Sequence, residues 1–124
     1  MNIRALFALL FVLASLCSAR AQSSDPEAGQ LLFNNACRTC HTVKEGDNRL
    51  GPNLHAIVGR KSGSLAGYGY SESMAKSDLV WDKATLDRFI ADPNAVVRGN
   101  KMQPYGGISS AEDRAKIIAY MEKN

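Results

Sequence analysis

The chain has 124 residues, with 15 Lys and Arg against 12 Asp and Glu, so its formal net charge at pH 7 is +3. This length is enough for one domain and too short for two. A charge this small excludes the strongly basic surface with which proteins bind nucleic acids.

The N-terminal segment has the three parts of a secretory signal peptide. A short positively charged start is followed by a nearly uninterrupted apolar run over residues 5–17, and Ala19 and Ala21 are the small residues that a signal peptidase reads. We expect cleavage after Ala21, which makes residues 1–21 the signal peptide and residues 22–124 one exported domain. The apolar run is short for a membrane span, which needs about 20 residues, and an uncleaved anchor is the alternative.

Cleavage would change the charge and the cysteine count. Cys17 ends the apolar run, and the bulky Leu16 before it does not suit a lipid attachment site, which needs a small residue there. The mature chain would have a net charge of about +1 and only two cysteines, Cys37 and Cys40. A domain this small buries a modest share of its surface. We therefore expect it to fold poorly without a large apolar cofactor.

The first predicted helix begins near Asp25. Asp is a favourable N-cap, Pro26 suits the first helical turn, and Glu27 complements the positive end of the helix dipole. Gly29 lowers the stability of this helix by roughly 1 kcal/mol relative to Ala. A glycine is useful at such a position where another helix must approach closely.

The segment Cys37-Arg38-Thr39-Cys40-His41 follows this helix and is the attachment pattern of a c-type haem. Each thiol can add to one vinyl group of the porphyrin, and the adjacent histidine can then bind the iron. A dithiol redox site would need a βαβ context, which the sequence lacks. A structural zinc site needs four protein ligands, and outside the segment only the distant His55 is available. The pattern predicts one haem c, bound covalently through Cys37 and Cys40, with His41 as an axial ligand.

A long loop region is expected next, because residues 46–69 are rich in glycine. Long loops in compact domains are usually functional, and this one would wrap around the haem. A short helix is expected around residues 71–76. Another helix should run from an Asp82 N-cap through Ile90 and stop at Pro93.

Residues 96–107 are again loop-like, and the last helix begins at Ser109 or Ser110. Each serine is followed three residues later by an acidic residue, which is a capping-box pattern. Apolar residues then recur at helical spacing and give this helix an apolar face. Together the elements predict an all-α fold of three to five helices, with long loops wrapped around one covalently bound haem.

Four side chains are candidates for the second axial position of the iron: His55, Met74, Met102 and Met121. Core packing on predicted helices explains Met74 and Met121, and His55 could equally be a hydrogen-bonded loop histidine. Met102 lies in a polar, Gly- and Pro-rich loop without an obvious packing role, so we predict that it binds the iron opposite His41. An iron with both ligands has no open position, which favours electron transfer, and methionine raises the reduction potential.

These elements resemble the class I c-type cytochromes, a family that includes mitochondrial cytochrome c and short bacterial relatives. The resemblance covers about residues 27–121 and implies the cytochrome c fold, a one-electron carrier and no enzymatic activity. The matching elements, in family order, are Gly29, Phe33, Cys37-Arg38-Thr39-Cys40-His41-Thr42-Val43, Gly51-Pro52-Asn53-Leu54-His55, Gly59-Arg60-Lys61, Gly67-Tyr68-Gly69-Tyr70, Trp81, Lys101-Met102, Arg114, Ile117, Ala119 and Tyr120.

The resemblance also implies roles for individual residues. The carbonyl of Pro52 would accept a hydrogen bond from the far ring nitrogen of His41 and fix the ring. Arg60, Tyr70 and Trp81 would surround the inner haem propionate, where donated hydrogen bonds offset the cost of burying a carboxylate. The first and last helices would cross at Gly29 and Phe33 on one side and Ile117 and Tyr120 on the other.

Three pocket positions depart from the family pattern. Phe89 replaces a common tyrosine, Met74 replaces a common asparagine, and Asn100 replaces a threonine two residues before the ligand. We count Asn100 among the haem-binding residues and expect a pocket with fewer hydrogen bonds, so the reduction potential can differ from that of relatives. The usual ring of lysines is also thinned, leaving Arg38, Arg98 and Lys101 as a mildly positive rim.

The sequence therefore predicts a soluble, monomeric electron shuttle of the bacterial periplasm, with no membrane span after signal cleavage. Its donor would be a membrane complex or a dehydrogenase, and its acceptor an oxidase, a reductase or a photosynthetic reaction centre. A fixed haem subunit of a periplasmic oxidoreductase is the alternative. A peroxidase-like enzyme would need an open or labile iron, and the lack of a second Cys-x-x-Cys-His motif argues against the di-haem peroxidase pattern.

Overall fold

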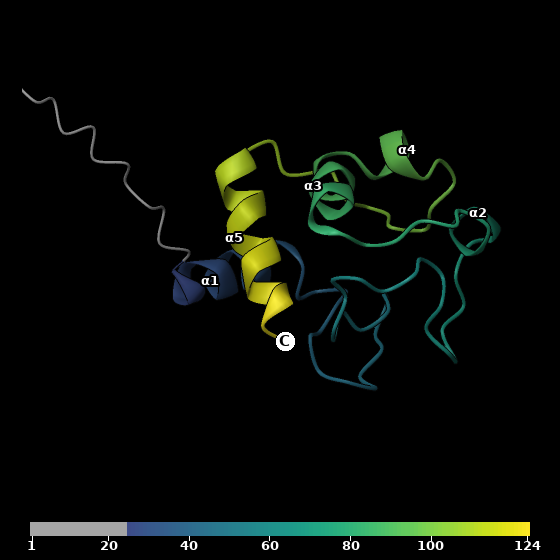
Figure 1. Ribbon diagram of the computed structural model, residues 1–124, viewed down its shortest axis with the longest axis horizontal. Helices are drawn as coiled ribbons and strands as arrows, with labels where there is room; N and C mark the ends of the chain where they lie inside the picture. Colours follow the sequence, from purple (N-terminus) through teal and green to yellow (C-terminus); the bar gives the residue numbers. More distant parts are fainter. Residues whose placement is uncertain (1–24) are drawn as a thin grey trace, which may run out of the picture.

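The computed structural model describes residues 25–124, and within them the chain forms five α-helices joined by long loops (Figure 1). In chain order these are α1 (Pro26–Ala36), α2 (Glu72–Ala75), α3 (Lys83–Ala91), α4 (Pro93–Val96) and α5 (Ala111–Glu122). The described range has no β-sheet, only an isolated bridge between Lys61 and Val80. The all-α prediction is confirmed. The predicted signal peptide, residues 1–21, lies outside the described residues.

The helices begin where short polar side chains cap them. The Asp25 carboxylate accepts the amide of Glu27 at 3.0 Å, and the Asp82 carboxylate accepts the amide of Thr85 at 2.7 Å. Ser110 caps α5 through a 3.2 Å hydrogen bond from the amide of Asp113. These are the N-caps that the sequence predicts, because an oxygen at this position satisfies an otherwise unpaired helical amide.

Pro93 does more than stop a helix. The sequence predicts only that α3 ends there, and α3 does end at Ala91. Pro93 is also the first residue of α4, and Asp92 caps this short helix by accepting the amides of Asn94 and Ala95. Proline suits this position because the first helical turn leaves its amides without helical partners.

The helices α1 and α5, from the two ends of the described chain, cross at close range (Figure 1). A Cβ atom on Gly29 would overlap the carbonyl oxygen of Lys116 and lie 3.0 Å from the Cβ of Tyr120. The rings of Phe33 and Tyr120 pack with their centroids 5.3 Å apart, and Ile117 is fully buried. The predicted crossing is confirmed.

The segment between α1 and α2 consists of loops. Residues 37–71 contain no helix, and backbone hydrogen bonds from Gly51 to Cys40 (2.8 Å) and from Leu54 to Thr42 (2.7 Å) fold this segment back onto the turn that follows α1. The amide of Gly59 donates to the carbonyl of Trp81 at 2.8 Å and joins the loop to the start of α3. Within residues 25–124, no helix has the length and apolar character needed to cross a bilayer.

Candidate haem-binding site

A cavity of about 450 Å³ with mainly apolar walls lies at the centre of the described chain. Ten buried apolar side chains form the hydrophobic core, and seven of them also line this cavity. These seven are Ile57, Trp81, Leu86, Phe89, Ile90, Ile117 and Met121. The core is therefore built around the cavity rather than beside it.

The end of α1 delivers the cysteines and the histidine to this cavity. The amide of Cys37 donates to the carbonyl of Phe33 at 2.8 Å and ends the helix. The amides of Cys40 and His41 both donate to the carbonyl of Cys37, at 3.1 and 3.0 Å, which forms a tight turn. All three side chains line the cavity as a result. Burial, with a contribution from Cys40, raises the pKa of the Cys37 thiol to about 11 in the folded chain.

His41 is held in one orientation. Its Nδ1 donates to the carbonyl of Pro52 at 2.8 Å, as the family resemblance implies. A Cβ on Gly51 would overlap the His41 ring, so only glycine lets the loop pass this close. Burial lowers the pKa of His41, and the nearby Arg60 lowers it further, although the Pro52 bond opposes this. The ring is therefore neutral, which is the form that binds a metal, and no residue of the described chain hydrogen bonds its Nε2.

Three of the four candidates for the second axial position lie in the cavity wall. Met74, Met102 and Met121 line it, whereas His55 does not. Met102 is half-buried and packs against the core, a contact that the polar loop sequence does not suggest. Coordination of iron by Met102 stays a prediction.

The three residues expected around a propionate also meet at the cavity. Arg60, Tyr70 and Trp81 all line it. Arg60 is half-buried and donates to the carbonyls of Asn53 (2.8 Å) and His55 (3.1 Å), and burial lowers its pKa. A guanidinium has five N–H donors, so donors remain for a carboxylate. The arrangement is compatible with the propionate role, which stays a prediction.

Asn100 lies in the same wall and is buried. Its side-chain oxygen accepts the amide of Met102 at 2.9 Å, and its side-chain nitrogen donates to the carbonyl of Val97 (2.8 Å) and to Asn94 (3.1 Å). Both N–H groups of the amide are thus used within the protein. We expected this position to make the pocket poorer in hydrogen bonds, whereas Asn100 forms three.

These features fit a c-type haem. The walls suit an apolar macrocycle, two thiols of the attachment spacing lie beside it, and an oriented neutral imidazole and three thioethers are available as axial ligands. Thioether and imidazole are the axial donors of electron-transfer cytochromes.

Comparison with known proteins decides the family. The family described as "Cytochrome C oxidase, cbb3-type, subunit III" matches residues 24–121. Cytochrome c2 from Rhodopila globiformis is 44% identical over 102 residues, which cover 82% of this chain and 95% of the relative. The chain belongs to the class I cytochromes c. Cytochrome c2 iso-2 from Magnetospirillum fulvum is 45% identical over 86 residues, covering 69% of this chain and 88% of the relative.

The fold of this class I cytochrome c agrees with a solved relative. The structure of cytochrome cH from Methylobacterium extorquens matches with a TM-score of 0.74 and 39% sequence identity, over 81% of this chain and 99% of that one. The cytochrome is therefore an electron carrier rather than an enzyme, and it carries one covalent haem c through Cys37 and Cys40.

The sequence reasoning missed Tyr105. Its side chain lines the cavity, and its hydroxyl donates to the carbonyl of Ile90 at 2.7 Å. Burial raises the pKa of Tyr105 to about 12, so the hydroxyl remains a donor at neutral pH. The only sequence signal is an aromatic residue three positions after Met102 in an otherwise polar loop.

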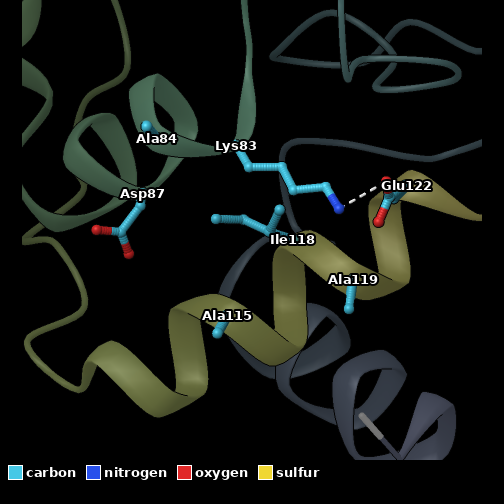
Figure 2. A pocket seen from close by; sticks show the side chains of 7 residues that line it. All are labelled: Lys83, Ala84, Asp87, Ala115, Ile118, Ala119 and Glu122. Carbon is cyan, nitrogen blue, oxygen red and sulfur yellow. Dashed lines mark ion pairs between the residues drawn. The ribbon is translucent and has the colours of Figure 1, made fainter.

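A second hollow of about 320 Å³ lies between α3 and α5 (Figure 2). Ala84 of α3 and Ala115, Ile118 and Ala119 of α5 line it, and the ion pair between Lys83 and Glu122 (2.8 Å) links the two helices beside them. It shares no lining residue with the haem cavity and has no cysteine, histidine or methionine, so it is not the redox site.

Proposed function

We propose that this cytochrome is a mobile electron shuttle of the bacterial periplasm whose haem iron is bound by His41 and Met102. The observation that carries the proposal is that both side chains line one mainly apolar cavity, on loops far apart in the sequence. The matched region covers 88% and 95% of two bacterial cytochromes c2 that resemble it, so each of these relatives consists of little more than this one domain, which supports a free carrier.

The residues of the chain would assist electron transfer by keeping the haem surroundings unchanged between redox states. The bound haem supplies an iron that gains or loses one electron. The Pro52 carbonyl holds the His41 ring, and the apolar walls exclude water. Arg60, Tyr70 and Trp81 would donate hydrogen bonds to a propionate, and Asn100, which lies in the cavity wall, would contact the haem.

The ligation is tested with the holoprotein. The ferric protein is expected to show a methionine–iron charge-transfer band and a low-spin spectrum, and Met102→Leu should abolish the band. Met74→Leu and Met121→Leu are matched controls, because each removes another thioether from the same wall, and both should keep the band. A high-spin wild-type spectrum, or a band that survives in Met102→Leu, would contradict the proposal.

Residues 1–21 would act as a signal peptide that is cleaved after Ala21, leaving residues 22–124 as the mature domain. The apolar run, the small residues before the cleavage position and the bacterial relatives support this. Mass spectrometry of the protein purified from a periplasmic fraction should give an N-terminus at Gln22. An intact Met1 in a membrane fraction would indicate an uncleaved anchor instead.

The redox partners would be proteins with a mildly acidic docking surface. Arg38 and Lys101 are exposed. Lys101 lines the cavity, and Arg38 directly follows Cys37, which also lines it. Two or three charges steer association less than a full lysine ring would. The association rate should therefore fall only weakly with ionic strength, and a steep fall would argue against this surface.

A fixed haem subunit is the second candidate, because the matching family is described as an oxidase subunit. A shuttle should elute at the mass of a monomer after gentle extraction of native cells. A fixed subunit should elute with a catalytic chain at every salt concentration.

A further inference from the structure

The backbone of Met102 is held from the N-terminal side by Asn100. The side-chain oxygen of Asn100 accepts the Met102 amide at 2.9 Å, while its two N–H groups donate to the Val97 carbonyl and to Asn94. Val97 is buried and directly follows α4. Asn100 therefore ties Met102 to a helix rather than to another part of its own loop.

The same loop is held from the C-terminal side by Tyr105. The Tyr105 hydroxyl donates to the Ile90 carbonyl at 2.7 Å, and the amide of Ile108 donates to the same oxygen at 3.1 Å. Ile90 lies in the last turn of α3, where carbonyls have no helical partner and need one from elsewhere. The loop after Met102 thus supplies the partners that complete α3.

We propose that Asn100 and Tyr105 are positioning residues that fix the Met102 loop on both sides and set how readily Met102 leaves the iron. The inference rests on the proposed His41 and Met102 ligation and deepens it. Neither residue needs to touch the iron, because each acts on the backbone that carries the thioether. Opening the loop far enough to free the sulfur requires at least one of these hydrogen bonds to break.

The size of the effect follows from the cost of a single hydrogen bond. A typical intramolecular hydrogen bond contributes about 1 kcal/mol net, which corresponds to roughly a fivefold change in an equilibrium or rate. Tyr105→Phe removes one such bond without changing the ring. Asn94→Ala removes one of the three bonds of Asn100 from an exposed position, so it tests the Asn100 side without emptying the core.

The experiment measures ligand exchange in the ferric holoprotein with free imidazole as the probe. At saturating imidazole, the loss of the methionine–iron charge-transfer band reports how fast Met102 leaves. We expect Tyr105→Phe and Asn94→Ala to speed this loss by roughly 2- to 10-fold each, and Asn100→Ala to speed it more where that variant folds.

Tyr68→Phe is the matched control. The Tyr68 hydroxyl also donates to a backbone carbonyl at 2.7 Å, but that carbonyl belongs to Leu50, in the loop between the haem motif and α2 rather than the Met102 loop. Its exchange rate should equal that of the wild type, even if its unfolding midpoint falls like that of Tyr105→Phe. Unchanged exchange in both Tyr105→Phe and Asn94→Ala, or equal acceleration in Tyr68→Phe, would overturn the inference. A wild type without the band would instead overturn the proposed ligation.

Discussion

Replacing Gly29 by alanine should destabilise the cytochrome even though alanine is the better helix former. A Cβ at this position would overlap the carbonyl oxygen of Lys116, which belongs to the backbone of α5 and cannot rotate away. The two helices must then move apart where Phe33 and Tyr120 pack. The close approach of α1 and α5 therefore depends on the missing side chain.

The expected magnitude is a balance of two opposing contributions. Alanine in place of glycine stabilises a helix by roughly 1 kcal/mol. Overpacking a well-packed contact typically costs about 1–3 kcal/mol, and a rigid backbone neighbour favours the upper part of this range. We expect a net loss of about 1–2 kcal/mol in the free energy of unfolding, or a fall in Tm of roughly 4–16 °C for a domain of this size.

Guanidinium unfolding of the holoprotein, followed by far-ultraviolet circular dichroism, measures this difference. Asn34→Ala is the control, because Asn34 is an exposed residue of α1 and alanine there improves helix propensity without meeting α5. It should be slightly more stable than the wild type. If Gly29→Ala matched or exceeded the wild type in stability, the steric account of this crossing would be refuted.

Three further predictions concern the pocket, a helix cap and the core. Phe89→Tyr should shift the midpoint potential, because it places a hydroxyl in the cavity wall beside Trp81. An unchanged midpoint potential in voltammetry would show that Phe89 does not influence the haem. The amide of Thr85 holds the pKa of the Asp82 carboxyl below its usual range. This cap therefore stabilises the fold above the ordinary carboxyl pKa of about 4 and is lost as pH falls through the lowered value. Asp82→Asn should flatten that acid dependence in thermal melts, and identical profiles would contradict it. Ile117→Ala should lower the free energy of unfolding by about 2–5 kcal/mol in denaturant titrations, because Ile117 is fully buried. A loss below about 1 kcal/mol would contradict this and show that neighbouring side chains fill the cavity.

Much of this fold could be predicted because its signals are local. The caps at Asp25, Asp82 and Ser110 each act on an amide two or three residues away. The haem motif is likewise contained in one turn, from Cys37 to His41. Chemistry confined to a few neighbouring residues is visible in a sequence without any knowledge of the fold.

The contacts around Met102 could not be predicted in the same way. Tyr105 bonds to Ile90, 15 residues earlier, and nothing in the loop sequence names that partner. Asn100, which replaces a threonine of the family pattern, was expected to leave the pocket with fewer hydrogen bonds. Its effect depends on Val97 and Asn94 being within reach, and this is a property of how α4 is placed. The sequence therefore predicts Met102 as the ligand but does not reveal the residues that hold its loop.

The crossing of α1 and α5 also sets the point during synthesis at which these two helices can first pack together. One partner begins at Pro26 and the other ends at Glu122, so the contact cannot form until the residues of α5 have been synthesised and are free to fold. Until then, α1, which directly precedes Cys37 and Cys40, lacks the contact with α5. In this interval both thiols would be accessible for haem attachment, before α5 packs against α1.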